Sequence, residues 1–246
     1  MSEQVLAAGA GLDIGSHWAT WHVFGLTLHG DTIIGTLFAG AVVVGLGLLV
    51  RAKISSGVPS GVQLFFETII KFVRDQVESV VGVRIAPYLV PLGMALFVFI
   101  LAANWIVVLP LHHWIPPPTA DVNMVYALTL IVFVGWHVDG IRRRNPGKHL
   151  ANITRGHYAP LAPLWLLEQF FVYPVSLSLR LFGNLFAGTI LLSLFAMLPP
   201  VISWLPNAGW KLFDMFIGLV QALIFVLLTI VYFSETIHDE SEAEAH

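Results

Sequence analysis

The chain has 246 residues, of which 57% are hydrophobic and only 11% are charged, and its formal net charge is −3. A soluble domain of this length needs a larger charged fraction to cover its surface, so the composition excludes a soluble fold and predicts an all-α integral membrane protein. No basic patch points to nucleic acid, and the absence of cysteine excludes disulfides and thiolate metal sites.

The predicted elements begin after a short N-terminal segment, residues 1–31, whose first 18 residues lack the basic stretch and apolar run of a signal peptide. Residues 61–81 alternate apolar and charged side chains at helical spacing, which predicts an amphipathic helix on the inner membrane surface. An acidic tail, residues 236–246, ends the chain. Five apolar segments of membrane-spanning length are predicted at 32–50, 88–109, 122–141, 161–198 and 209–235.

The distribution of basic residues predicts the orientation of these segments. Nearly all basic residues outside the apolar segments lie in two connections, 51–87 and 142–160, and Lys211 alone falls on the other side. The positive-inside rule places both connections on the inner side of the membrane. The N-terminus is then external and the acidic tail internal, an orientation with which all five segments agree.

The fourth segment is too long for a straight crossing, because about 38 residues of helix extend roughly 57 Å. It must tilt steeply or break, and Pro174 lies inside it. Pro199, Pro200 and the run from Pro206 to Gly209 predict a turn into the fifth segment. The last two segments are therefore predicted to form a long tilted helical hairpin.

Arg180 is the single charged residue between Glu168 and Lys211. An arginine at membrane depth costs about 2.5–3.5 kcal/mol on insertion scales, so it needs a partner, a wet cavity or a route to the surface. Small and polar residues share its helix face, which favours close approach of another helix; they are Ser176, Gly183, Asn184, Ala187 and Gly188. The alternative is that Arg180 snorkels to the surface and that the glycines pack helices of this same chain.

The fifth segment carries a second lone charge, Asp214, with Gly218, Gln221 and Phe225 on the same face. The alternative for Asp214 is a local pair with Lys211 at the start of the helix.

Polar residues approach Arg180 from both sides of the membrane. The orientation above places Asp214 near the outer helix ends, together with Asp121, Asn123, His112 and His113. Glu168, Tyr173 and Ser176 lie on the inner side of Arg180. No continuous polar line passes Arg180, the pattern expected of two offset aqueous half-channels separated by a fixed positive charge. Transport then requires a carboxylate on another subunit, which loses its proton near Arg180 because an adjacent cation lowers a carboxyl pKa by about 1–3 units.

Several segments resemble subunit a of bacterial F-type ATP synthase. The most specific are Pro174–Asn184, Gln221–Phe225 and Leu228–Tyr232, and the similarity extends to Asn104–Pro110, Ala120–Asn123 and Gly57–Gln63. The resemblance implies a multi-pass stator subunit of the bacterial plasma membrane, present in one copy beside a c-ring and peripheral-stalk b subunits. Such a subunit is not itself an enzyme, holds no metal or other cofactor, and carries protons as the default ion.

The resemblance also implies roles for individual residues. Arg180 would be the essential arginine that faces the ring carboxylates, with Asn184 and Gln221 as its polar neighbours. Asp121, Asn123 and Asn104 would lie along the outer proton path. Many relatives have Glu just after the arginine motif and His early in the last helix, whereas this chain has Thr189 and Asp214 there. We expect the acidic function to have moved to Asp214.

Two other classes of membrane protein predict features that the sequence lacks. A secondary transporter usually shows paired repeats, and none is found. An intramembrane hydrolase predicts a nucleophile–base pair or a His-Glu-x-x-His motif, and neither is present. His112 and His113 are a weaker candidate for a metal site than for an ordinary wet loop or a proton-path pair.

Overall fold

The computed structural model describes residues 20–23, 26–53, 61–108, 117–143, 167 and 171–243. Their elements, in chain order, are β1 (Thr20–Val23), β2 (Leu26–His29), α2 (Gly30–Lys53), α3 (Gly61–Val80), α4 (Leu89–Trp105), η1 (Ile106–Val108), η2 (Pro118–Ala120), α5 (Val122–Arg143), α8 (Tyr173–Ala196) and α9 (Pro200–Ala243). Helices dominate this part of the chain, which confirms the predicted all-α class. The predicted amphipathic helix at 61–81 corresponds to α3.

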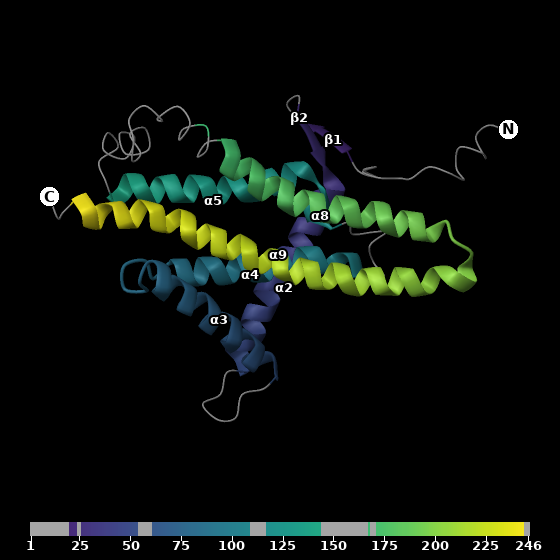
Figure 1. Ribbon diagram of the computed structural model, residues 1–246, viewed down its shortest axis with the longest axis horizontal. Helices are drawn as coiled ribbons and strands as arrows, with labels where there is room; N and C mark the ends of the chain where they lie inside the picture. Colours follow the sequence, from purple (N-terminus) through teal and green to yellow (C-terminus); the bar gives the residue numbers. More distant parts are fainter. Residues whose placement is uncertain are drawn as a thin grey trace.

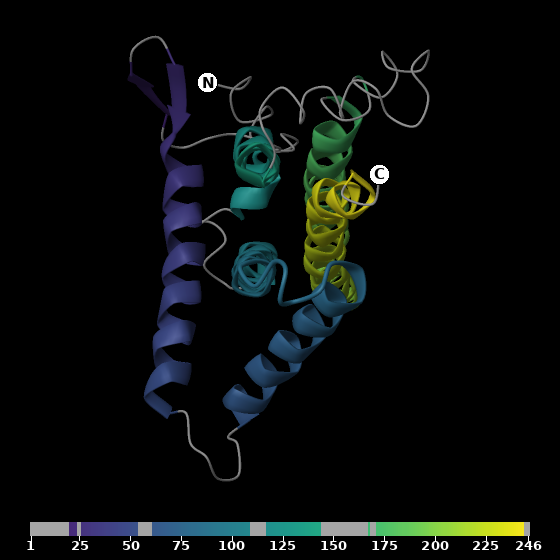
Figure 2. The same cartoon turned by 90° about the vertical axis from the view of Figure 1, so that its left-hand side faces the viewer.

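The helices run in two directions. α4, α5, α8 and α9 lie alongside one another on the long axis of the molecule, and α2 crosses them steeply at one side (Figures 1 and 2). α8 and α9 form an antiparallel hairpin that turns at one end of the molecule, as predicted for the last two segments (Figure 1). α3 slants back from the far end of α2 toward α4 (Figure 2).

The core lies where α4 meets α3 and α9. Gly93 of α4 packs tightly against both neighbours, because a Cβ placed there would lie 2.9 Å from Val73 Cγ1 and 3.1 Å from Val226 Cγ1. α2 joins the core through small residues, since Ala39 and Ala103 are both fully buried where α2 crosses α4. Small residues let helix backbones come close in a membrane, where packing replaces the hydrophobic effect between helices.

Three helical segments of the described chain are long and apolar enough to cross a membrane: Gly30–Ala52, Val122–Arg143 and Val201–Ser234. α4 is a shorter apolar helix of 17 residues. Large apolar side chains project outward from these helices, among them Leu37, Ile131 and Val201 with exposed fractions of 67%, 65% and 82%. Such exposure suits lipid or a neighbouring subunit and would be costly in water.

A short antiparallel hairpin, β1–β2, precedes α2 and was not predicted. Its register pairs Thr20 with His29 and Val23 with Leu26. Strands of only four residues are much shorter than a membrane-spanning segment, so the length of apolar runs does not reveal them. The hairpin places His29 directly before the first turn of α2.

The turn between α8 and α9 is shorter than predicted. It comprises residues 197–199, and α9 begins at Pro200 and continues through Pro206, so the predicted turn at Pro206–Gly209 is wrong. Proline is tolerated inside membrane helices where neighbouring groups satisfy the backbone carbonyl that it leaves unbonded. α9 also extends to Ala243, beyond the predicted end at residue 235.

The start of the predicted fourth segment, from 161, lies outside the described residues except for Leu167. α8 begins at Tyr173, and Pro174 stands in its first turn, where the missing N–H needs no helical partner. Residues 171–172, directly before α8, form a π-helical turn, so Pro174 lies where the helix changes from π to α geometry, and the predicted tilt or break of the longer segment stays a prediction.

Candidate functional site

Arg180 lies on an exposed face of α8. Its side chain is exposed, and no described residue forms a hydrogen bond or ion pair with its guanidinium group. Apolar side chains flank it on the same helix, including Leu179 at 60% and Phe186 at 40% exposure. The cation thus stands in an apolar surface without a counter-charge from the described part of the chain.

The small residues near Arg180 divide into two groups. A Cβ at Gly183 would meet nothing within 4 Å, and Ser176 and Ala187 are exposed, so this part of the face is open. Gly188 is buried, and a Cβ there would lie 3.3 Å from Asp214 Oδ1. Packing within the chain therefore explains why position 188 has no side chain, but it does not explain the glycine at position 183. We name the open part, formed by Ser176, Arg180, Gly183 and Ala187, the arginine face.

Asp214 lies inside the hairpin between α8 and α9. The residue is 6% exposed, and its Oδ2 atom has no hydrogen-bond partner among the described residues. No ion pair joins it to Lys211, although both side chains are described, so the alternative of a local Lys211–Asp214 pair is wrong. Gln221 and Phe225, farther along α9, are also buried. Asp214 is thus a buried carboxyl group held against the helix that carries Arg180.

The end of α4 holds the turn of α9 that carries Asp214. Trp105 Nε1 donates a hydrogen bond to the Met215 carbonyl at 3.1 Å, and Asn104 Nδ2 donates to the Gly218 carbonyl at 3.4 Å. Gly218 permits this approach, because a Cβ there would lie 3.1 Å from Asn104 Cβ. Thr119 Oγ1 in turn donates to Asn104 Oδ1 at 2.9 Å. A buried polar link therefore joins η2 to α9.

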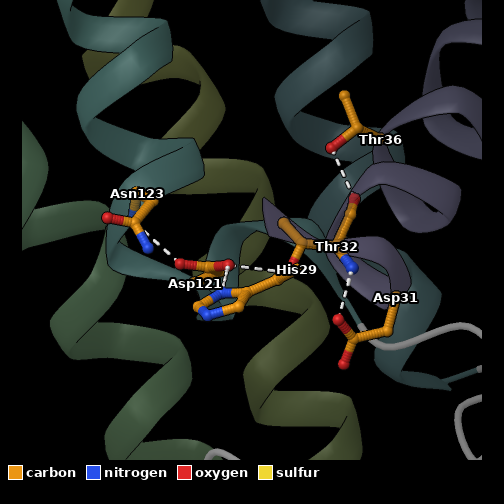
Figure 3. Close-up of polar contacts among 6 residues, drawn as sticks. All are labelled: His29, Asp31, Thr32, Thr36, Asp121 and Asn123. Atoms are coloured by element: carbon orange, nitrogen blue, oxygen red, sulfur yellow. Dashed lines mark hydrogen bonds and ion pairs between the residues drawn. The ribbon is translucent and has the colours of Figure 1, made fainter. Parts of the chain in front are cut away.

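A second polar group lies where the β1–β2 hairpin, the start of α2 and the start of α5 meet (Figure 3). Asp121 is its centre: Oδ2 accepts hydrogen bonds from His29 Nδ1 at 2.8 Å and Thr32 Oγ1 at 2.7 Å, and Oδ1 accepts from the Asn123 backbone N–H at 2.8 Å. Asp31 accepts a hydrogen bond from the Thr32 backbone N–H at 2.9 Å. We name His29, Asp31, Thr32 and Asp121 the hairpin-end cluster.

The charge state of Asp121 follows from these contacts. Burial alone would raise the pKa of this carboxyl group, but the hydrogen bonds from Thr32, His29 and the Asn123 backbone outweigh it and lower the pKa below its ordinary value of 3.8. Asp121 is therefore an anion at every physiological pH. A carboxylate in this state accepts hydrogen bonds and does not carry a proton.

The structure describes only some of the other residues predicted for the site. Asn123 has an exposed side chain and contributes its backbone N–H, and Asn184 is half-buried on α8. Of Tyr173 only the backbone is described, and Glu168, His112 and His113 lie outside the described residues.

His29, Thr32 and Thr119 belong to these polar groups but were missed by sequence reasoning. Thr119 had a visible signal, because it stands two residues before Asp121. His29 and Thr32 had none, since their contacts to Asp121 span about ninety residues of sequence.

Comparison with known proteins gives one consistent result. The family model described as ATP synthase A chain matches residues 33–234. ATP synthase subunit a of Mycobacterium bovis is 48% identical, with 98% of this chain and 99% of that protein covered. The subunit a proteins of Acidothermus cellulolyticus and Gloeobacter violaceus are 45% and 33% identical, covering 91% and 95% of this chain and 82% and 94% of those proteins.

Proposed function

Because the chain belongs to the ATP synthase subunit a family, a membrane component of that multi-subunit complex, we propose that it conducts protons through two offset half-channels separated by Arg180. In this proposal it is a non-catalytic stator subunit without a cofactor, set beside the c-ring and the b subunits of the peripheral stalk. It lies in the bacterial plasma membrane with its N-terminus outside and its C-terminus inside.

The exposure of Arg180, and its lack of a counter-charge among the described residues, carry the proposal. A guanidinium group in an apolar surface at membrane depth is costly unless a partner or water compensates it. Since the described chain supplies no counter-charge, a carboxylate on a neighbouring subunit is the natural partner. The open arginine face leaves room for a helix backbone to approach, as small residues do at membrane interfaces.

Arginine suits this separating role because its guanidinium group keeps its charge when it loses water, whereas a buried lysine can lose its proton. A proton crossing the membrane releases roughly 2.3 kcal/mol per 100 mV. A direct leak past position 180 would dissipate this energy without turning the ring. A permanent positive charge there opposes the leak, and it also favours deprotonation of each ring carboxyl group that passes.

Buried polar groups would line the outer half-channel. It would begin at the hairpin-end cluster, continue through Thr119 and Asn104, and reach the ring by way of Asp214. Asp214 would then be the acid that stands in for the Glu missing at Thr189, and its closeness to Gly188 puts it beside the stretch of α8 that contains position 189. The inner half-channel would contain Ser176 with Glu168 and Tyr173.

The test is coupled ATP synthesis in vesicles that contain the whole complex with Arg180→Ala or Arg180→Lys. We expect both variants to assemble and both to lose proton-driven synthesis. Arg74→Ala is the matched control, because Arg74 is an exposed arginine on α3, and it should synthesise ATP normally. Synthesis near the wild-type rate in Arg180→Lys would refute the electrostatic role of the guanidinium group.

A further inference from the structure

The hairpin-end cluster contains one group that the proposed proton path does not yet use, His29. It is the last residue of β2, and its side chain is 20% exposed, whereas that of Asp121 is 7% exposed. The imidazole ring thus connects solvent to a buried carboxylate. Figure 3 shows the ring directed at Asp121, with Thr32 beside it.

The hydrogen bond to Asp121 determines the tautomer of His29. An ionised carboxylate only accepts hydrogen bonds, so the hydrogen of the 2.8 Å contact must be on Nδ1 of the imidazole. Protonation of the neutral ring then takes place at Nε2 and gives an imidazolium beside the carboxylate. The same pairing of an oriented imidazole with a carboxylate fixes the tautomer at many functional sites.

Two acidic residues belong to the hairpin-end cluster together with His29. Asp121 contacts the ring from the start of α5, and Asp31, which is 2% exposed, lies in the first turn of α2 and accepts from the Thr32 backbone N–H. The adjacent strand β1 places Thr20 opposite His29, and its own histidine, His22, stands opposite Thr27.

From this geometry we infer that His29 is the group that exchanges protons with the outer medium, and that Asp121, itself fixed by the Thr32 hydroxyl, holds its ring in position. The inference rests on the proposed function and changes the role of Asp121, which becomes a fixed counter-charge. Hydronium at the outer surface transfers a proton to Nε2, so that an O–H bond breaks as an N–H bond forms. The imidazolium then releases the Nε2 proton to a water molecule on the path toward Thr119 and Asn104, while Nδ1–H stays bonded to Asp121.

The test uses the whole ATP synthase reconstituted in liposomes, with the outer pH varied at constant inner pH and membrane potential. His29→Gln keeps a side-chain N–H donor for Asp121 but cannot take up a proton. We expect this variant to assemble normally and to synthesise ATP about tenfold more slowly than the wild type. Loss of a positioned acid–base group typically costs roughly 100-fold or more in rate, but here water still delivers some protons without the histidine. The dependence of the rate on outer pH should lose one protonation step.

His29→Ala with imidazole added to the outer medium separates proton transfer from structure, and we expect the added base to restore part of the rate. His22→Gln is the matched control, since His22 is an exposed histidine of the same hairpin, and it should behave as wild type.

Three results would overturn the inference. The first is a wild-type rate and pH profile in His29→Gln, and the second is a slow His29→Gln together with no imidazole rescue of His29→Ala, which would make His29 structural. In either case, loss of synthesis in Arg180→Ala within the same preparations leaves the proposed function standing. The third is coupled synthesis in Arg180→Ala, which would refute the proposed function and this inference with it.

Discussion

Replacing Asp214 with asparagine should separate proton transfer from packing. The two side chains have nearly the same shape, and Asp214 Oδ2 has no hydrogen-bond partner among the described residues, so the exchange breaks no described contact of that atom. Burying an unsatisfied polar group costs about 1–3 kcal/mol, and a neutral amide costs no more than a carboxylate. We therefore expect Asp214→Asn to leave assembly and thermal stability unchanged or slightly improved.

Proton-driven ATP synthesis should respond in the opposite way. An amide cannot take up and release a proton, and loss of a positioned acid–base group lowers a rate by about 100-fold or more. The assay is ATP synthesis per assembled complex in vesicles energised by a pH gradient and a membrane potential. Thr189→Glu, added to Asp214→Asn, should restore part of the rate, because position 189 adjoins the glycine that contacts Asp214.

Asp139→Asn is the matched control for Asp214→Asn. Asp139 accepts hydrogen bonds from Tyr88 at 2.6 Å and from Arg143 at 3.0 Å, so its exchange should lower thermal stability but leave synthesis per assembled complex unchanged. A wild-type rate in Asp214→Asn, measured beside this control, would show that Asp214 carries no protons.

Two further substitutions test the packing of the helices and one of their polar contacts. Gly93→Ala should destabilise the protein by about 1–3 kcal/mol and lower the thermal midpoint of the purified complex, because the new methyl group would lie 2.9 Å from Val73 Cγ1; an unchanged midpoint would contradict the packing of α4 against α3. Tyr88→Phe should cost at most about 1 kcal/mol at neutral pH, since the lost hydrogen bond to Asp139 is at the surface. Burial, followed by the contact with Asp139, raises the pKa of Tyr88 from 10.0 to about 12, so the folded state holds this proton more tightly than the unfolded state. The advantage of the wild type over Tyr88→Phe is then complete below pH 10, and thermal unfolding of both proteins should show it fall steadily as the pH rises from 10 to 12. A difference that stays constant across that range would contradict the raised pKa.

Much of the architecture could be predicted because membrane segments obey a simple length and polarity rule. The amphipathic helix α3, the last hairpin and the family were all confirmed, since apolar runs and the motif around Arg180 are local in sequence. The turn at Pro206 was predicted wrongly because proline marks a turn more reliably in water than inside a membrane helix. The steep crossing of α2 over the other helices could not be predicted, because tilt is set by packing between helices and not by segment length.

Some residues of the candidate site can likewise be recognised from local sequence, whereas others are brought together only by the fold. Arg180 and Asp214 could be identified because a lone charge in an apolar run is visible without a structure. The hairpin-end cluster could not, since His29 reaches Asp121 only after β2, α2 and α5 meet. Asp121 was correctly selected as a polar residue of interest, but only its hydrogen bonds reveal that it is held as an anion.

The most direct measurement of the central claim is disulfide cross-linking between the arginine face and the c-ring. The chain contains no cysteine, so Gly183→Cys introduces a single thiol one turn from Arg180, at a position with nothing of the described chain within 4 Å. Its partner is a cysteine placed one turn from the ring carboxylate, in a complex shown to synthesise ATP before oxidation. Gly47→Cys on α2, which is equally open, is the control. We expect a cross-link to the ring from position 183 and none from position 47; no cross-link at 183, or equal cross-linking at both, would contradict an Arg180 that faces the ring.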